Sequence, residues 1–162
     1  MVNARAVAET VTDPELPMLT LAELGVLRDV QETSGHVEVT ITPTYTGCPA
    51  LDAMRDDLRA RLTDAGYADV QIRTVLDPPW TTDWITEPGR RKLHSAGISP
   101  PGPAPHHPTG PIPLTLGPTR HVACPHCGSA ATTELSRFGS TACKSLRRCD
   151  TCDEPFEHFK EI

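Results

Sequence analysis

The cysteines are the residues of this 162-residue chain whose type and spacing best support chemistry. Cys124 and Cys127 form one C-x-x-C pair, and Cys149 and Cys152 form a second pair after 21 intervening residues. Two such pairs can place four thiolates tetrahedrally around one ion, and the gap has room for a hairpin. The spacing therefore predicts a structural zinc site. A single iron ion bound by the same four ligands stays an open alternative. A redox-active dithiol explains the double pair less well.

Cys48 stands apart from the other cysteines, in the segment Thr46-Gly47-Cys48-Pro49. A strand is expected to end just before it and a helix to begin there, so we expect its sulfur at the helix N-cap. Unpaired backbone N–H groups and the helix dipole favour a thiolate at that position. Cys48 is therefore a candidate nucleophile or soft-metal ligand, although burial as a structural residue stays open. No convincing Cys-His-Asn nucleophilic set accompanies it.

Three further side chains have two interpretations each. Cys143, beside Lys144, is either a small buried apolar residue or a second thiol that helps to hold or pass a cluster. Trp80 and Trp84 are spaced i, i+4. They are either ordinary packing residues or aromatic anchors of a partner-docking patch.

Alternating and helical patterns indicate the elements that must position these residues. Val37, Val39 and Ile41 alternate with polar residues, as in a half-buried strand. An apolar stripe at helical spacing predicts the strongest helix over 49–65. The full expectation is helices over 4–11, 49–65 and 86–97 and strands over 26–31, 36–42 and 70–76. This order, α-β-β-α-β-α, predicts an α+β fold with a small mixed sheet covered by helices, followed by an all-β zinc ribbon.

Composition divides the chain into an acidic front part and a cysteine-rich back part. The whole net charge of −6 falls within residues 1–98, and five of the six cysteines follow residue 120. Residues 99–118 contain eight of the 17 prolines, which predicts an extended linker. We therefore expect a front domain over 1–98, the linker over 99–118 and the zinc ribbon over 119–162.

The same composition excludes some classes of function. No basic stripe accompanies the negative net charge, so we expect no nucleic-acid partner. No apolar run approaches the roughly 20 residues of a membrane helix, and the N-terminus lacks a secretory signal. We therefore expect a cytoplasmic protein without a membrane partner. In that compartment, clustered cysteines are more often metal ligands than disulfides.

Ordered motifs along the chain resemble known families. The segments at 13–17 (DPELP), 24–30 (LGVLRDV) and 46–50 (TGCPA) resemble the iron–sulfur assembly domain of SufT-like proteins and cytosolic Fe–S targeting factors. Three more segments, 77–85, 89–93 and 138–144 (FGSTACK), restrict this resemblance to a narrower family. Together with the ribbon, the chain is similar to the PaaD (PaaJ) family of accessory subunits of the phenylacetyl-CoA 1,2-epoxidase system. The front domain over 1–98 would then be the assembly domain of that family.

The resemblance implies a maturation role rather than catalysis of the epoxidation. It implies a cluster-handling site of Asp13, Glu15, Thr46 and Cys48, which would meet a transient iron–sulfur cluster or iron. The implied client is an epoxidase component, above all the reductase that carries flavin and a [2Fe–2S] cluster. One cysteine cannot hold such a cluster, so a homodimer, a small thiol, Cys143 or the client would complete the ligands.

Three alternatives remain open. Asp13 and Glu15 also suit a turn and helix-capping pair. The chain could instead be a non-catalytic structural or regulatory subunit of the oxygenase. It could also be an enzyme that uses the Cys48 thiol.

Overall fold

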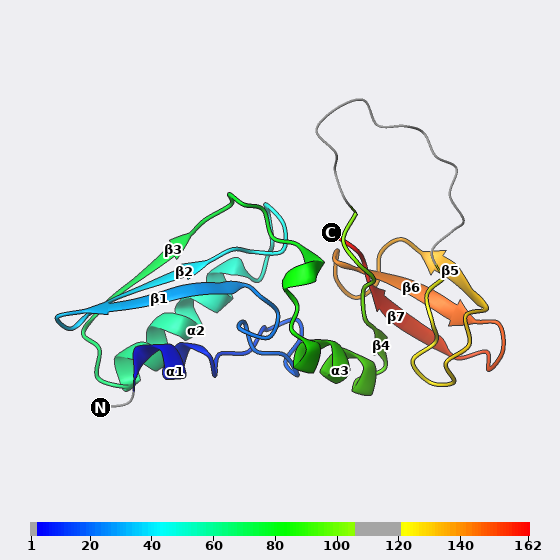
Figure 1. Ribbon diagram of the computed structural model, residues 1–162, viewed down its shortest axis with the longest axis horizontal. Coiled ribbons are helices and arrows are strands. Elements are labelled where there is room, and N and C mark those ends of the chain that lie inside the picture. Colours follow the sequence, from blue (N-terminus) through cyan, green and yellow to red (C-terminus); the bar gives the residue numbers. More distant parts are fainter. Residues whose placement is uncertain (1–2, 106–120) are drawn as a thin grey trace, which may run out of the picture. The chain divides into compact units, whose positions relative to one another are not determined.

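The structure is a computed structural model that describes residues 3–105 and 121–162 (Figure 1). The chain divides into two units, Met1–Lys92 (unit 1) and Leu93–Ile162 (unit 2). The division falls after residue 92 rather than after the expected residue 98. Most of the expected linker, with His106 and His107, lies outside the described residues.

Unit 1 contains a three-stranded mixed sheet in the order β1-β2-β3. β1 (Leu27–Thr33) is antiparallel to β2 (His36–Ile41), which is parallel to β3 (Asp69–Thr74). Ser34 and Gly35 both have positive φ, as the two-residue turn of a twisted hairpin requires. The strand predicted over 36–42 is confirmed, and its three alternating apolar side chains are fully buried.

Helices cover one face of this sheet (Figure 1). α2 (Leu51–Asp64) connects the parallel strands β2 and β3, and α1 (Ala4–Ala8) packs beside it. Met54, Leu58 and Leu62 of the predicted stripe are buried. α2 ends before Gly66, whose φ of +100° provides a left-handed stop after the helix.

The last part of unit 1 contains the 3-10 helix η1 (Thr82–Trp84) and the start of α3 (Glu87–Ser95). The hydroxyl of Thr86 accepts the N–H of Gly89 at 3.2 Å, so Thr86 caps the start of α3. α3 ends two residues earlier than expected, because the backbone of Gly97 turns to a φ of +78°.

Unit 2 is a four-stranded sheet in the order β4-β7-β6-β5. Its strands are β4 (Ile98–Ser99), β5 (Thr132–Ser136), β6 (Lys144–Cys149) and β7 (Pro155–Phe159). β5, β6 and β7 form the antiparallel ribbon, and β4 pairs with β7 in parallel. Ser99, expected as the first linker residue, is therefore a buried strand residue. The predicted fold class, an α+β domain followed by a ribbon, is confirmed.

The ribbon core is small, which matters for what holds it together. Beside two of the cysteines it contains Val122 and Phe156, with Cys152 packed against them. A core of this size rarely supports a fold without a metal or a disulfide. Within the described part of the chain, no helix has the length and apolar character needed to cross a membrane.

Candidate functional site

Two similar turns hold the four cysteines of unit 2. In the first, the N–H of Gly128 donates to the carbonyl of Cys124 at 2.9 Å. In the second, the N–H of Asp153 donates to the carbonyl of Cys149 at 3.0 Å. Gly128 and Asp153 both have positive φ (76° and 60°), so each turn curls back over its own cysteine pair. The two C-x-x-C segments therefore adopt the same local fold.

Backbone donors are directed at two of the sulfurs. The N–H of His126 lies 3.4 Å from Cys124 Sγ, and the N–H of Thr151 lies 3.4 Å from Cys149 Sγ. N–H groups directed at a sulfur stabilise the thiolate form that binds metal. These donors leave no signal in the sequence, because any residue except proline supplies a backbone N–H.

The four sulfurs are close enough to share one ion. Their ligand atoms all lie within 4.8 Å of one another. Cys124 Sγ and Cys152 Sγ are 3.8 Å apart, and Cys127 Sγ and Cys149 Sγ are 3.5 Å apart. A tetrahedral site with metal–sulfur bonds of about 2.3 Å has sulfur–sulfur edges of roughly 3.8 Å. The geometry fits a four-thiolate metal ion, and the cysteines predicted as ligands form a structural metal site.

Two thiols of this site, Cys149 and Cys152, have pKa values shifted in opposite directions. The backbone N–H of Cys152, with other N–H and thiol donors, lowers the pKa of Cys149 to about 6. A backbone N–H also acts on Cys152, but burial and the neighbouring sulfurs prevail and raise its pKa to about 12. Four like groups this close cannot all become anionic without a cation. A bound metal ion supplies that positive charge.

Cys48 lies in a tight turn between β2 and α2, here called the cysteine turn (residues 45–48). The N–H groups of Gly47 and Cys48 both donate to the carbonyl of Tyr45, at 3.0 and 3.3 Å. The expected N-cap position is wrong: α2 begins at Leu51 with Ala50 as its N-cap, two residues beyond Cys48. The turn takes up the residues that the helix was expected to include. The Cys48 residue is 8% exposed, and the cysteine turn around it is partly open to solvent.

Asp13 shapes a second turn, here called the acidic turn (residues 13–16). Its Oδ1 accepts the N–H groups of Glu15 and Leu16, at 2.8 and 2.9 Å. Asp13 is 5% exposed and Glu15 is half-buried. This is the turn-capping arrangement that the sequence left open for the acidic pair.

Backbone hydrogen bonds attach both turns to the same end of the sheet. The N–H of Leu21 donates to the carbonyl of Val11 at 2.8 Å, which closes the loop that contains the acidic turn. The carbonyl of Leu21 accepts the N–H of Val26 at 2.9 Å. The carbonyl of Val26 accepts the N–H of Thr42, also at 2.9 Å. Val26 precedes β1 and Thr42 follows β2. Because these strands are antiparallel, both turns leave from one end of the β1–β2 pair.

Cys143 is buried in unit 2, just before β6. Its Sγ lies 3.0 Å from the hydroxyl of Thr141. The next residue, Lys144, forms an ion pair with Glu157 at 2.9 Å, which was not predicted from the sequence. Cys143 and Cys48 lie in different units.

The two tryptophans have different environments. Trp80 is 4% exposed, and its Nε1 donates to the carbonyl of Leu24 at 3.1 Å. This is the ordinary packing that the sequence left open. Trp84 is half-buried, and the guanidinium of Arg28 lies 3.5 Å from the centre of its ring. A docking role for either tryptophan stays a prediction.

Two family models match successive parts of the chain. Residues 3–78 match the model described as "Iron-sulfur cluster assembly protein". Residues 108–160 match the model described as "PaaD zinc beta ribbon domain". The second match includes all four cysteines of the metal site.

Relatives with curated names cover either nearly all of the chain or about half of it. An Escherichia coli (strain K12) protein, named as a putative D subunit of 1,2-phenylacetyl-CoA epoxidase, is 44% identical over 157 residues, which are 97% of this chain and 90% of that protein. A Porphyromonas gingivalis protein named "Fe-S protein maturation auxiliary factor" is 34% identical over 86 residues, which are 52% of this chain and 81% of that protein.

A solved structure shares the fold of about half of the chain. It is a domain of unknown function (DUF59) from Bacillus anthracis, 27% identical, with a TM-score of 0.52 over 56% of this chain and 87% of that one. The resemblance expected from the motifs is thus confirmed by the ribbon model, the assembly model and the full-length relative. The chain belongs to the PaaD family of phenylacetyl-CoA epoxidase D subunits, which joins a DUF59-type iron–sulfur assembly domain to a zinc ribbon.

Proposed function

We propose that this protein is a non-catalytic maturation factor of the phenylacetyl-CoA epoxidase system, acting in the cytoplasm. In this proposal it assists assembly of an iron–sulfur cluster on the [2Fe–2S] and flavin reductase component, or transfers a cluster to it. The cluster is cargo that the protein binds briefly and releases. Support comes from a full-length relative named as an epoxidase subunit and a half-length relative named as a maturation factor.

Cys48 is the observation that carries the proposal. It is the only cysteine in the sequence over residues 3–78, the part that matches the iron–sulfur assembly family. Its neighbours Gly47 and Pro49 are less buried than Cys48 itself, so a small shift of the cysteine turn would uncover the thiol. The acidic turn leaves from the same end of the sheet and would bring Asp13 and Glu15 as oxygen ligands or proton acceptors.

The ligand set of this chain suits a carrier better than a permanent redox protein. A [2Fe–2S] cluster usually takes four protein ligands, and unit 1 offers one thiol. The remaining ligands would come from a second copy, a small thiol, Cys143 or the client. A cluster held so incompletely is released more readily than one with four fixed thiolates.

The metal of the four-cysteine site is zinc in this proposal. The ribbon family is described as a zinc ribbon, and the sulfur–sulfur distances fit the tetrahedral geometry that zinc adopts in structural sites. A closed site of four thiolates leaves no open position for a substrate. It therefore holds unit 2 together and takes no part in cluster transfer.

Co-expression tests the proposed role directly. The reductase component is produced with no partner, with this protein, or with its Cys48→Ala variant, and its iron, acid-labile sulfide and visible spectrum are measured. We expect full cluster content only with the parent protein. Cys143→Ala is measured beside them and reports whether Cys143 is one of the missing ligands.

Reconstitution provides the second measurement. Anaerobically reconstituted parent protein should show a Mössbauer signal of bound iron that Cys48→Ala loses, while both keep their zinc. A fully clustered reductase made without this protein would refute the maturation role.

A structural or regulatory subunit is the second candidate, because the full-length relative is named as a subunit. In that case the protein would co-purify with the oxygenase at fixed stoichiometry. Cys48→Ala would then leave both the complex and the reductase cluster unchanged.

A further inference from the structure

The outer strand of the ribbon presents apolar side chains to solvent. β5 is the last strand of its sheet and pairs only with β6 among the described residues (Figure 1). Leu135 is 53% exposed, and Phe138, in the turn that follows β5, is 66% exposed. Leu135 falls where the register between β5 and β6 shifts, so the ladder is irregular there. An open strand edge beside exposed apolar side chains is a common place for another chain to add.

Most of the lysines and arginines described in unit 2 have acidic partners. Lys144, Arg147 and Arg148 pair with Glu157, Glu134 and Asp150 respectively. Arg137 and Lys160 form no ion pair with any described residue.

Both of these cations lie next to Phe138. Arg137 precedes it in sequence, and the ammonium of Lys160 lies 4.9 Å from the centre of the Phe138 ring. Lys160 also donates to the carbonyl of Arg137 at 3.1 Å, which holds the two cationic residues together. The exposed ring is therefore flanked by two positive charges without anionic partners among the described residues.

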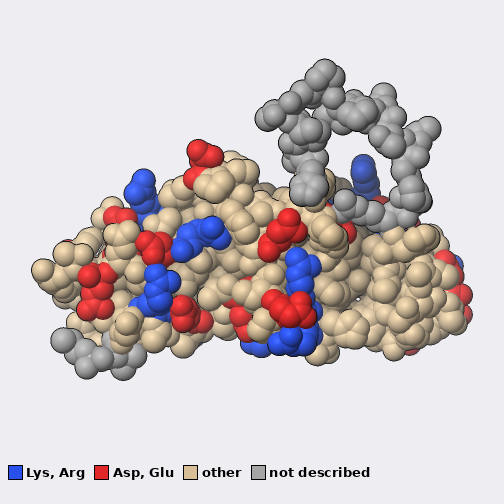
Figure 2. Space-filling view, viewed as in Figure 1, with Lys and Arg blue, Asp and Glu red and all other residues tan. Residues whose placement is uncertain are grey.

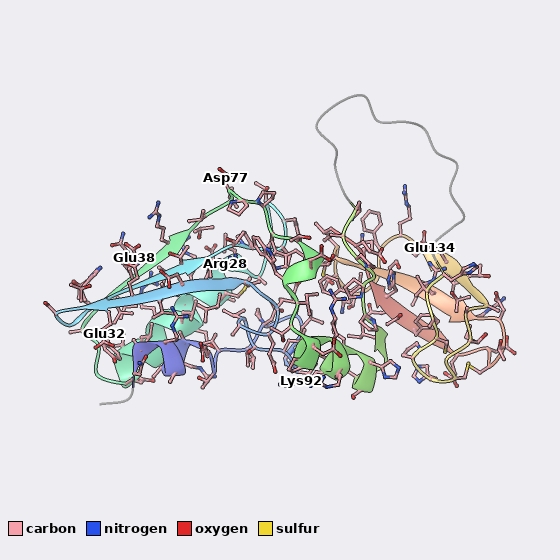
Figure 3. All side chains as sticks on the ribbon, in the orientation of Figure 1. Arg28, Glu32, Glu38, Asp77, Lys92 and Glu134 are labelled. Carbon is pink, nitrogen blue, oxygen red and sulfur yellow. The ribbon has the colours of Figure 1, made fainter. Side chains whose placement is uncertain are left out.

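A hollow of about 450 Å³ lies against the same ring. It is lined by Glu134, Arg137, Phe138, Lys160 and Glu161. Its two carboxylates are already engaged: Glu134, which projects from β5 in Figure 3, pairs with Arg147, and Glu161 lies 3.6 Å from His158. Within the described chain, Arg137 and Lys160 form no ion pair, whereas each carboxylate of the hollow has a side-chain partner.

We propose that the β5 edge, with Leu135, Phe138, Arg137 and Lys160, is a docking surface for an acidic, extended segment of another protein that carries an apolar side chain. The apolar side chain enters the hollow against Phe138, and carboxylates on either side of it pair with Arg137 and Lys160. Aromatic and cationic side chains that become desolvated on binding contribute most of the binding free energy at interfaces. The proposal does not depend on the role of Cys48.

Binding of a defined peptide to the zinc-loaded full-length protein tests this surface. The probe is a fluorescein-labelled eight-residue peptide with two repeats of Asp-Leu-Glu-Phe, and a peptide with lysine in place of the acidic residues is the reference. We expect the acidic peptide alone to bind, with amide shift changes in a ¹⁵N NMR spectrum centred on residues 134–138 and 160. Binding should weaken as salt rises.

Variants then separate this surface from general charge effects. Lys160→Glu, Arg137→Glu and Phe138→Ser should each weaken binding of the acidic peptide at least five-fold while zinc content stays at one equivalent. Arg59→Glu makes the same charge change on α2 and should leave binding within two-fold. The proposal would be overturned if the lysine peptide bound equally well or if the acidic peptide did not bind. It would also be overturned if Arg59→Glu lost as much affinity for the acidic peptide as the three surface variants. So would binding to phosphatidylglycerol vesicles in place of the peptide.

Discussion

Individual atoms decide how closely the segments of unit 1 approach one another. The backbone of Gly25 has a φ of +76°, a conformation that side chains disfavour. A Cβ at this position would lie 2.6 Å from Trp84 Cβ and 2.7 Å from the Trp84 carbonyl oxygen. Glycine is thus required twice here, for backbone conformation and for the approach of η1.

Gly25→Ala should therefore destabilise unit 1 by about 3 kcal/mol or more, from strain and overpacking together. Gly35→Ala is a matched control, since Gly35 also has positive φ (85°) but has no atom within 4 Å of the Cβ position. We expect it to cost about 1 kcal/mol. Urea denaturation followed by tryptophan fluorescence measures both, because both tryptophans lie in unit 1. Equal losses in the two variants would contradict the steric part of the explanation.

A second prediction at this scale concerns Glu23. Its carboxylate lies 2.7 Å from the Lys92 ammonium and accepts the N–H of Thr20 at 3.0 Å. Burial acts to raise the pKa of Glu23, but Lys92 and Thr20 together hold that pKa below its ordinary value of 4.5. Because the folded pKa is the lower one, the stabilisation is present above pH 4.5 and is lost as pH falls through the folded pKa.

Glu23→Gln should accordingly lower the free energy of unfolding by about 1 kcal/mol at pH 7. The difference from the parent should shrink below about pH 4.5, as measured by urea denaturation with tryptophan fluorescence. Glu87→Gln is the control, because Glu87 and its partner Arg91 are 71% and 65% exposed and their pair should contribute almost nothing. A parent–variant difference that stayed constant between about pH 7 and pH 3.5 would refute the assignment.

At the scale of elements, the four-cysteine site joins the strands of the ribbon. Cys149 ends β6, and the turn that contains Cys152 leads into β7. The first cysteine pair joins this hairpin to the segment before β5. Since the apolar core is small, metal–thiolate bonds supply the stability that packing lacks.

Replacing one ligand should consequently unfold the ribbon. Cys124→Ser and Cys152→Ser should each lose one equivalent of zinc, and the amide NMR signals of residues 132–159 should collapse to unfolded positions. Cys143→Ser is the control, because Cys143 is a buried cysteine outside the four-sulfur group. It should keep its zinc. Unchanged metal content in either ligand variant would refute the four-thiolate site.

At the scale of the whole molecule, the protein consists of two units with separate sheets and separate sources of stability. Unit 1 has a conventional apolar core formed by the sheet and the helices α1 and α2. Unit 2 has a small apolar core, so we expect it to depend on its metal site. On the face shown in Figure 2, acidic and basic side chains are interspersed over unit 1 rather than gathered by sign.

Removal of the metal should therefore unfold unit 2 while unit 1 stays folded. With a strong zinc chelator, unit 2 should lose its NMR dispersion while the tryptophan unfolding midpoint of unit 1 shifts by no more than about 2 °C. Returning zinc should restore unit 2. Simultaneous loss of both signals on chelation would show that the units fold as one.

Short-range patterns were enough to predict several features from the amino-acid order. The two C-x-x-C pairs predicted the metal ligands, because ligand spacing within a turn is a local property. Val37, Val39 and Ile41 predicted a half-buried strand, because alternation along a strand follows from its backbone geometry. The stripe over α2 was equally visible, since helical periodicity is also local.

Other features became visible only in the folded chain. Ser99 resembled the start of a proline-rich linker, yet β4 pairs with β7, which is distant in sequence. Cys48 was expected at a helix N-cap, but the bonds to Tyr45 form a turn that delays α2. The close approach of η1 to Gly25 gave no signal in the sequence. The pairing of β4 and the approach of η1 depend on which distant segment supplies a partner, and local composition does not encode that choice. The turn at Cys48 is local, but the same segment also suits a helix start, and the folded chain decides between the two.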